Sequence, residues 1–161
     1  MQNQQALVTS MILESWFGQV KRTSDLIHAL TDEQLMQEAA PKRNRGIYLL
    51  GHLTAVHDRM QPLLDLGEQL YPALDAPFLN NPDKTVTDLP ATGELRRYWT
   101  EVNAELAKQF SRLQPDEWLH RHTAVSPEAF VKEPHRNRLN VLLSRTSHLA
   151  YHFGQLAFLK P

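Results

Sequence analysis

The sequence contains no cysteine. This absence excludes disulfide bonds, thiolate metal sites and a cysteine nucleophile. No apolar run approaches the length of a membrane-spanning helix, about 18 residues. The first residues, MQNQQALVTSMILESW, lack the basic start and the continuous apolar stretch of a signal peptide. We therefore expect a cytoplasmic protein with no membrane partner.

The chain also lacks a large excess of either charge. Its 17 Lys and Arg residues face 18 Asp and Glu residues, which gives a formal net charge of −1. A broad basic surface for nucleic acid is therefore not expected, and we predict no nucleic-acid partner. The 161 residues predict one domain, residues 1–161, with its own core. The eight histidines are a high count, and they are the feature that needs an explanation.

The ten prolines divide the chain. Because proline breaks helix interiors, the long stretches that avoid proline are the candidate helices. Apolar residues recur there at helical spacing, which predicts four long helices, at about 4–30, 45–66, 92–113 and 137–160. Pro62 should bend the second helix or mark its last turns. The capping-box signature TDEQ, at 31–34, predicts a short extra helix that ends at about residue 38.

Long connections follow the second and third predicted helices. Residues 67–91 are rich in proline, and at about 3.3 Å per residue they can cross the ~30 Å length of a helix. The helices that they join need not be antiparallel neighbours. The predicted fold is therefore all-α, a four-helix bundle with a long crossover between helices two and three. We expect Trp16, Phe17 and Trp99 in its core.

The segment SHLAYHFGQLAF, at 147–158, sets two histidines four residues apart on the inner side of the last helix. Residues at this spacing face the same way, so His148 and His152 could hold one metal ion. The spacing equally allows a hydrogen-bonded core histidine beside one that lines a wet groove. Because HLAYH lacks the glutamate of zinc proteases, and the only E-x-x-H lies outside the main helices, zincin and di-iron sites are excluded.

A third ligand would have to come from another helix. GHLTAVHDRM, in the second helix, offers His52 and His57, which lie on opposite flanks of the apolar stripe, and spacing does not choose between them. His28 lies near the end of the first helix, where a cation next to the last carbonyls is a sufficient explanation. The others fall in the second long connection and are expected to be solvated: His120, His122 and His135.

GHL in the second helix, together with H-x-x-x-H-F-G-Q-L in the last, resembles the DinB-like (YfiT-like) superfamily of metal-binding four-helix bundles. The resemblance covers essentially the whole chain. It implies that the metal ligands are His52, His148 and His152. It leaves His57 as a flanking residue with no assigned role.

The resemblance also implies a function. Three neutral nitrogens leave an open coordination position, which is typical of a catalytic site. Imidazole suits zinc or nickel, and also iron or copper. Characterised members of the superfamily include transferases and an isomerase that use low-molecular-weight thiols, and members often form homodimers. The expectation is therefore a homodimeric metal-dependent enzyme, a transferase or hydrolase, that acts on a small molecule. The alternative is a non-enzymatic metal-binding or dimerising stress-related bundle.

Three further residues lie near the predicted ligands. Gln155 lies about 20° from His148 around the helix, and it could orient a ligand, hold substrate or cap a polar cavity. Arg145 could bind a substrate carboxylate, although an ordinary arginine with a buried stem is the preferred reading. Gly154 is expected to allow close approach of another helix.

The motif match predicts different effects for the two histidines of the second helix. His52→Ala should abolish tight metal binding, because it removes one of three ligands, whereas His57→Ala should leave binding nearly intact. Metal content after dialysis of each purified variant measures this difference. The reverse result would show that the ligand was assigned to the wrong position.

Overall fold

The structure is a computed structural model that describes residues 4–160. Its four long helices are α1 (Gln4–Ala29), α3 (Gly46–Asp58), α6 (Thr92–Phe110) and α8 (Arg138–Ala157). The short ones are α2 (Asp32–Leu35), α4 (Met60–Leu63), η1 (Pro72–Leu74), α5 (Asp75–Phe78), η2 (Glu117–Leu119) and α7 (Pro127–Lys132). The described residues contain no strand, which confirms the predicted all-α class. Across that same range, every helix is too short or too polar to cross a bilayer.

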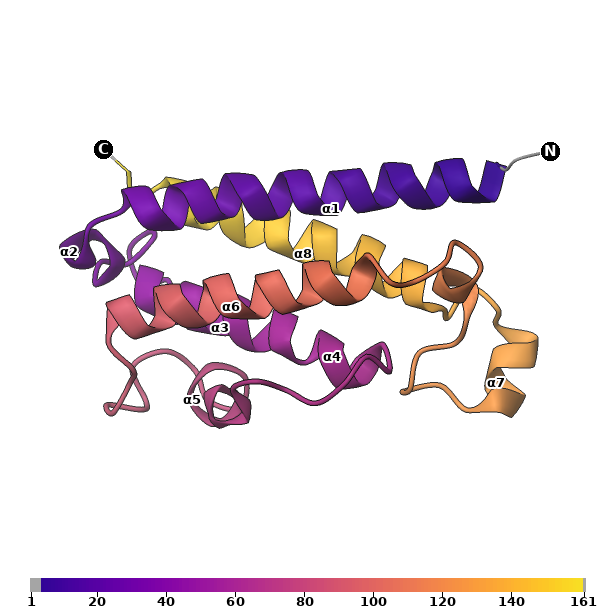
Figure 1. Cartoon of the computed structure of the whole chain (residues 1–161). Helices are drawn as coiled ribbons and strands as arrows, with labels where there is room; N and C mark the ends of the chain where they lie inside the picture. The colour runs from indigo at the N-terminus through magenta and orange to yellow at the C-terminus, as the bar shows by residue number, and fades with distance from the viewer. Residues whose placement is uncertain (1–3, 161) are drawn as a thin grey trace.

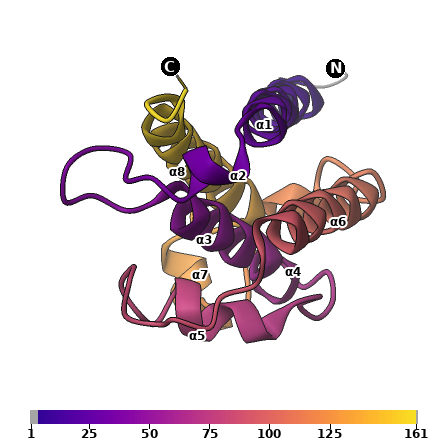
Figure 2. The same ribbon diagram turned by 90° about the vertical axis from the view of Figure 1, so that its left-hand side faces the viewer.

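The long helices pack side by side, in the order α1, α8, α3 and α6 around their common axis (Figures 1 and 2). α3 and α6 run in the same direction, and so do α1 and α8 (Figure 1). The chain between α4 and α6 must therefore return along the length of the molecule, as the predicted crossover requires. α8 and α6 lie on opposite flanks of α3, so that each flank of α3 faces a different neighbour (Figure 2).

The predicted second helix divides into two pieces, α3 and α4. Its helical hydrogen bonds are interrupted because Pro62 has no N–H to donate to the carbonyl of Asp58, four residues earlier. The capping box is confirmed, since the Thr31 hydroxyl accepts from the Gln34 amide while the Gln34 side chain accepts from the Thr31 amide. Proline avoidance did not predict the short helices α5 and α7.

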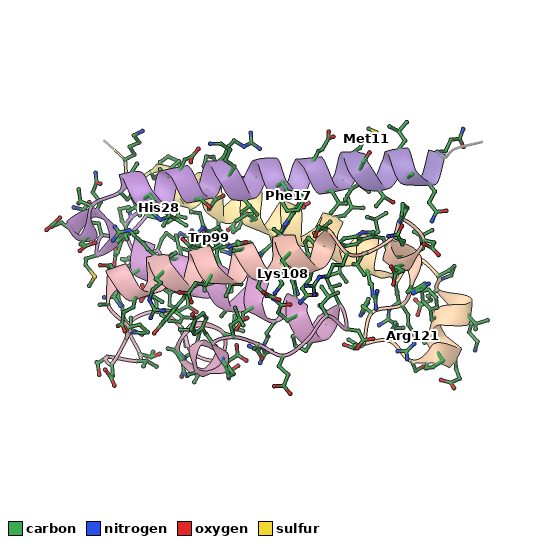
Figure 3. The ribbon with its side chains drawn as sticks, in the orientation of Figure 1. Met11, Phe17, His28, Trp99, Lys108 and Arg121 are labelled. Atoms are coloured by element: carbon green, nitrogen blue, oxygen red, sulfur yellow. The ribbon has the colours of Figure 1, made fainter. Side chains whose placement is uncertain are left out.

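The core lies between the long helices. Trp16 and Trp99 are almost fully buried, as predicted. The Trp99 indole N–H donates to the Ser24 hydroxyl at 2.9 Å and so joins α6 to α1. Trp99 is labelled on α6 in Figure 3. The prediction for Phe17 is wrong, because its side chain is 39 % exposed. It follows Trp16 directly and points about 100° away from it around α1, so it lies at the edge of the buried face.

The crossover is attached to α3 by the buried carboxylate of Asp58. One oxygen accepts from the Leu70 amide at 2.9 Å, and the other accepts from the Tyr71 amide at 2.7 Å. Asp58 is fully buried. Its carboxylate therefore satisfies two amides at the point where the chain turns back.

Further along the crossover, the chain is attached to the beginning of α3. The Tyr48 hydroxyl donates to the Asn81 carbonyl at 2.8 Å. The guanidinium of Arg45 pairs with the carboxylate of Asp83 at 2.8 Å, and the Arg45 amide donates to the same carboxylate. The crossover therefore packs along α3 and runs antiparallel to it, from the end of that helix to its beginning.

Asp58→Asn should destabilise the fold, because an amide accepts through only one of its two polar ends and leaves one backbone N–H unpaired. Removing a charged acceptor from buried donors costs about 1.5–3 kcal/mol. The unfolding free energy, measured by urea denaturation, should fall by this amount. The control is Asp25→Asn, which removes an exposed partner of Lys21 and should change stability little. Equal losses in both variants would contradict the structural role of Asp58.

Candidate metal centre

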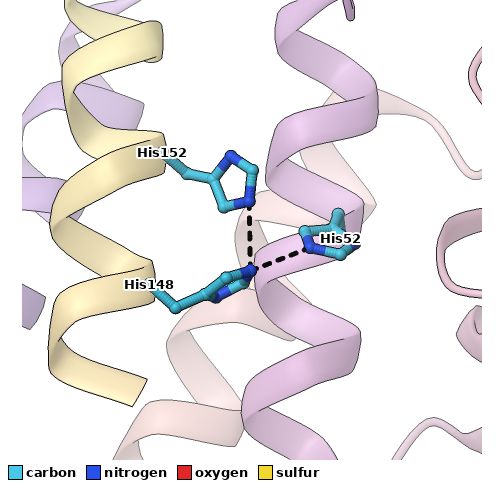
Figure 4. A group of neighbouring side chains, drawn as sticks. All are labelled: His52, His148 and His152. Carbon is cyan, nitrogen blue, oxygen red and sulfur yellow. Dashed lines mark hydrogen bonds between the residues drawn. The ribbon is translucent and has the colours of Figure 1, made fainter. Parts of the chain in front are cut away.

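Three imidazole rings from α3 and α8 converge between the two helices (Figure 4). Nε2 of His148 lies 3.2 Å from Nε2 of His52 and 3.1 Å from Nε2 of His152. One ring atom of each residue lies within 4.8 Å of the other two. Two residues come from successive turns of α8 and the third comes from α3, so the packing of the two helices creates the cluster.

The separations fit a shared metal ion. Two nitrogens bound tetrahedrally at 2.0–2.1 Å from one zinc ion lie about 3.3 Å apart. The two Nε2 separations that involve His148 are close to this value. If the side chains had to change rotamer in order to bind an ion, their Nε2 atoms would lie much further apart than this. The cluster is therefore already close to the geometry of a bound ion.

A backbone carbonyl fixes the ring of His52. Its Nδ1 lies 2.9 Å from the carbonyl oxygen of Phe78, the last residue of α5. Because a carbonyl only accepts, Nδ1 carries the proton, and Nε2 of the neutral ring presents its lone pair to the cluster. A hydrogen bond of this kind orients a metal-binding histidine and raises its basicity.

Gly51 allows this contact. A Cβ at this position would lie only 2.3–2.5 Å from ring carbons of Phe78, so the aromatic ring occupies the space that a side chain would need. The position directly before His52 therefore has to be a glycine for Phe78 to lie where it does. Both the glycine and the histidine of the GHL motif therefore contact Phe78: Gly51 leaves room for its ring, and His52 donates to its carbonyl.

Gln155 fixes the ring of His152 in a similar way. Nδ1 of His152 lies 2.6 Å from Oε1 of Gln155, and with this amide orientation it donates its proton there. Nε2 of His152 then faces the cluster as a lone pair. The sequence allowed three uses for Gln155, and the hydrogen bond to His152 fits the first of them, which is to orient a ligand ring.

The proton count favours a cation at this point. Since His52 and His152 hold their protons on Nδ1, only His148 could bring a proton to the space between the three Nε2 atoms. Nδ1 of His148 is buried and has no partner among the described residues, so neither of its tautomers satisfies both ring nitrogens. A bound cation would take up all three Nε2 lone pairs.

Burial keeps the three rings neutral. It is the main cause that lowers the pKa of His52, of His152 and of His148, whose pKa falls to about 4. Metal ligation requires the neutral ring. At neutral pH the cluster is therefore in the protonation state that metal binding needs.

The structure separates His57 from the cluster. Its fully buried ring lies between the rings of Trp16 and Trp99, at centroid distances of 4.7 and 4.9 Å, and its Nδ1 donates to Oδ1 of Asn103 at 2.8 Å. Burial lowers the pKa of His57 to about 3, so this ring is neutral as well. Its neighbours belong to α1 and α6, on the flank of α3 that faces away from α8.

The remaining histidines lie elsewhere. His28 is exposed and shares a hydrogen bond with the Ser24 carbonyl in the last turns of α1, as expected for a ring near the helix end. His120 and His135 are exposed, in agreement with prediction. His122 is only partly exposed, and its Nδ1 is buried, so the expectation of a solvated ring is wrong there.

The expectation for Gly154 is also wrong. It is exposed, and a Cβ built on it meets no atom within 4 Å, so no other part of the described chain approaches it. Gly51 is the glycine that permits close approach. The apolar periodicity of the sequence does not predict this role, although the position of Gly51 beside His52 in the GHL motif is a usable signal.

An all-helical fold with three histidines from two helices at one point is the arrangement that the motifs predicted. The chain belongs to the DinB superfamily, whose family model matches residues 18–156. The fold is similar to the crystal structure of a conserved protein from Enterococcus faecalis, with a TM-score of 0.63, 16 % identity and coverage of 94 % of each chain. No curated protein matches the sequence.

Two glycines beside the histidines provide a matched pair of variants. Gly51→Ala should weaken metal binding, because the new methyl group displaces Phe78 and with it the carbonyl that orients His52. Gly154→Ala should leave binding unchanged and raise helix stability by up to about 1 kcal/mol. Competition with a chromophoric chelator measures the affinity of each variant. Equal affinities would show that the Phe78 contact does not set the ligand geometry.

Proposed function

We propose that this protein is a metal-dependent enzyme in which His52, His148 and His152 hold one divalent ion, zinc or nickel. The observation that carries the proposal is the convergence of three neutral Nε2 atoms, at 3.1 and 3.2 Å from one to the next. Three protein ligands are the number found in catalytic zinc sites, which keep a position for water or substrate.

The proposed reaction is the transfer of a low-molecular-weight thiol to a small electrophile. A divalent ion at the cluster would supply Lewis acidity, which lowers the pKa of a thiol or water that reaches its open position. Since the chain has no cysteine, the thiol has to come from outside. The Phe78 carbonyl and the Gln155 amide would hold two ligand rings in place as the cosubstrate binds.

We also propose that the enzyme is a homodimer. Exposed apolar side chains lie on the outward side of α8 and on the residue that follows it: Leu143, Tyr151 and Phe158. They lie within about 80° of one another around the helix, so they share one face. Tyr151 precedes His152 directly, and the centroids of their rings lie 5.1 Å apart, so a partner that covers this face would lie close to the site.

The proposal predicts about one metal ion per purified chain and conjugation of a thiol to an electrophile that a chelator abolishes. His148→Ala should lose both properties, because the ring contributes the Nε2 that lies nearest to each of the other two. The control His28→Ala removes an exposed histidine and should keep both. Metal analysis and a chromophoric electrophile assayed with a panel of thiols measure the two properties.

Two results would overturn the proposal. Protein without bound metal, even after addition of zinc or nickel, would remove the metal centre. One ion per chain with no turnover across the thiol panel would favour the alternative, a metal-binding bundle that is not an enzyme.

A further inference from the structure

Arg145 is a half-buried cation whose guanidinium has no partner among the described residues. Within residues 4–160, the guanidinium groups of three arginines make no hydrogen bond or ion pair with the described chain: Arg43, Arg112 and Arg145. Arg43 and Arg112 are exposed, so water can satisfy them. Arg145 is only partly exposed, and its Nε is buried without a partner. Such a group is costly unless something else satisfies it.

Arg45 shows how this chain treats another partly buried arginine. Its guanidinium pairs with the carboxylate of Asp83, and this bond raises the pKa of Arg45. Burial lowers the pKa of Arg145, and no acidic group counteracts it. The fold therefore supplies a counter-charge to one of these arginines and leaves the other without one.

Arg145 lies on the face of α8 that carries the histidine cluster. It precedes His148 by three residues and His152 by seven, and both spacings place side chains on the same side of a helix. Burial first, and the positive charge of Arg145 in addition, lower the pKa of His52 and of His148. Arg145 lowers the pKa of the buried His57 as well, so it is the helical spacing that places the guanidinium on the side of the cluster.

The cluster itself contributes no negative charge. A divalent ion held by three neutral imidazoles keeps its full charge, and Arg145, the one charged side chain besides the histidines that shifts the pKa of these rings among the described residues, is also positive. No carboxylate of the described chain is among the groups that shift the pKa of the three rings. Two partly buried cations that lie close together repel each other, and an anion that lies near both offsets this repulsion.

We propose that Arg145 binds an oxyanion group of the ligand that occupies the open position of the metal. The ligand therefore carries a carboxylate, phosphate or sulfonate a short distance from its thiol or other metal-binding atom. This inference rests on the proposed function and specifies the class of cosubstrate. The guanidinium suits the role because it has five N–H donors and no acceptor, and it binds oxyanions through paired hydrogen bonds.

Three probes of similar length separate charge from thiol binding: 2-mercaptoethanol, 2-mercaptoethanesulfonate and 2-aminoethanethiol. Their neutral, anionic and cationic groups follow the same two-carbon thiol, and 3-mercaptopropanesulfonate extends the reach by one carbon. Each is titrated anaerobically into protein loaded with Co²⁺, and the thiolate-to-cobalt absorption band reports binding. The variants are Arg145→Gln, the charge-retaining Arg145→Lys and the exposed control Arg43→Gln.

In the wild type, at least one sulfonate should bind more tightly than the neutral thiol. Arg145→Gln should weaken that sulfonate about tenfold or more and leave 2-mercaptoethanol nearly unchanged. Arg145→Lys should retain part of the preference, and Arg43→Gln should retain all of it. The cationic thiol should bind better to Arg145→Gln than to the wild type. Circular dichroism and cobalt content establish that each variant is folded and loaded.

Sulfonate affinities that are the same in the wild type and in Arg145→Gln would overturn the inference, while thiol binding to cobalt would leave the proposed function intact. If no thiol binds to cobalt, the thiol chemistry of the proposed function fails instead. Arg145 is then tested by inorganic phosphate, followed through the cobalt absorption bands. Phosphate should bind more weakly to Arg145→Gln, and equal affinity would overturn the inference in that case too.

Discussion

The hydrogen bond between Nδ1 of His52 and the carbonyl of Phe78 determines much of this structure. It requires the crossover to pass directly over α3, and a side chain on Gly51 would prevent that approach. Asp58 and Arg45 hold the same segment of chain at the two ends of α3. The orientation of a candidate metal ligand is therefore set by the route of a connection as well as by helix packing, which explains why such a long connection is held by buried contacts.

The two flanks of α3 use the same residue type for different purposes. His52, on the flank that faces α8, meets two more imidazoles, while His57, on the flank that faces α6, meets two indole rings and an amide. Both rings are kept neutral by burial. The two rings differ in their neighbours. His52 lies beside nitrogen lone pairs that a cation can bind, whereas His57 lies beside apolar surface and a single hydrogen-bond acceptor.

This difference explains how far the sequence could predict the structure. Proline positions and apolar spacing predicted three of the four long helices within a few residues, because both act locally on the backbone. The second was predicted to reach about residue 66, whereas α3 ends at Asp58 and a separate short helix, α4, follows. These local patterns could not choose between His52 and His57, because helical periodicity gives the angle of a side chain but not the helix that packs against it. The motif resemblance supplied that long-range information. The role of Gly51 was missed for the same reason, since its contact with Phe78 joins residues 27 positions apart.

The preferred reading of Arg145 as an ordinary arginine depended on a quantity that the sequence does not contain, namely the position of the nearest acid. For Arg45 that acid is Asp83, 38 residues away and brought near by the crossover. For Arg145 the fold brings near the histidine cluster and no carboxylate that shifts its pKa. An arginine with a buried stem still keeps its guanidinium nitrogens in water, whereas Nε of Arg145 has lost its water without gaining a partner. The unmet hydrogen bond and the excess of positive charge therefore lie on the same face of α8, and one anionic ligand would satisfy both.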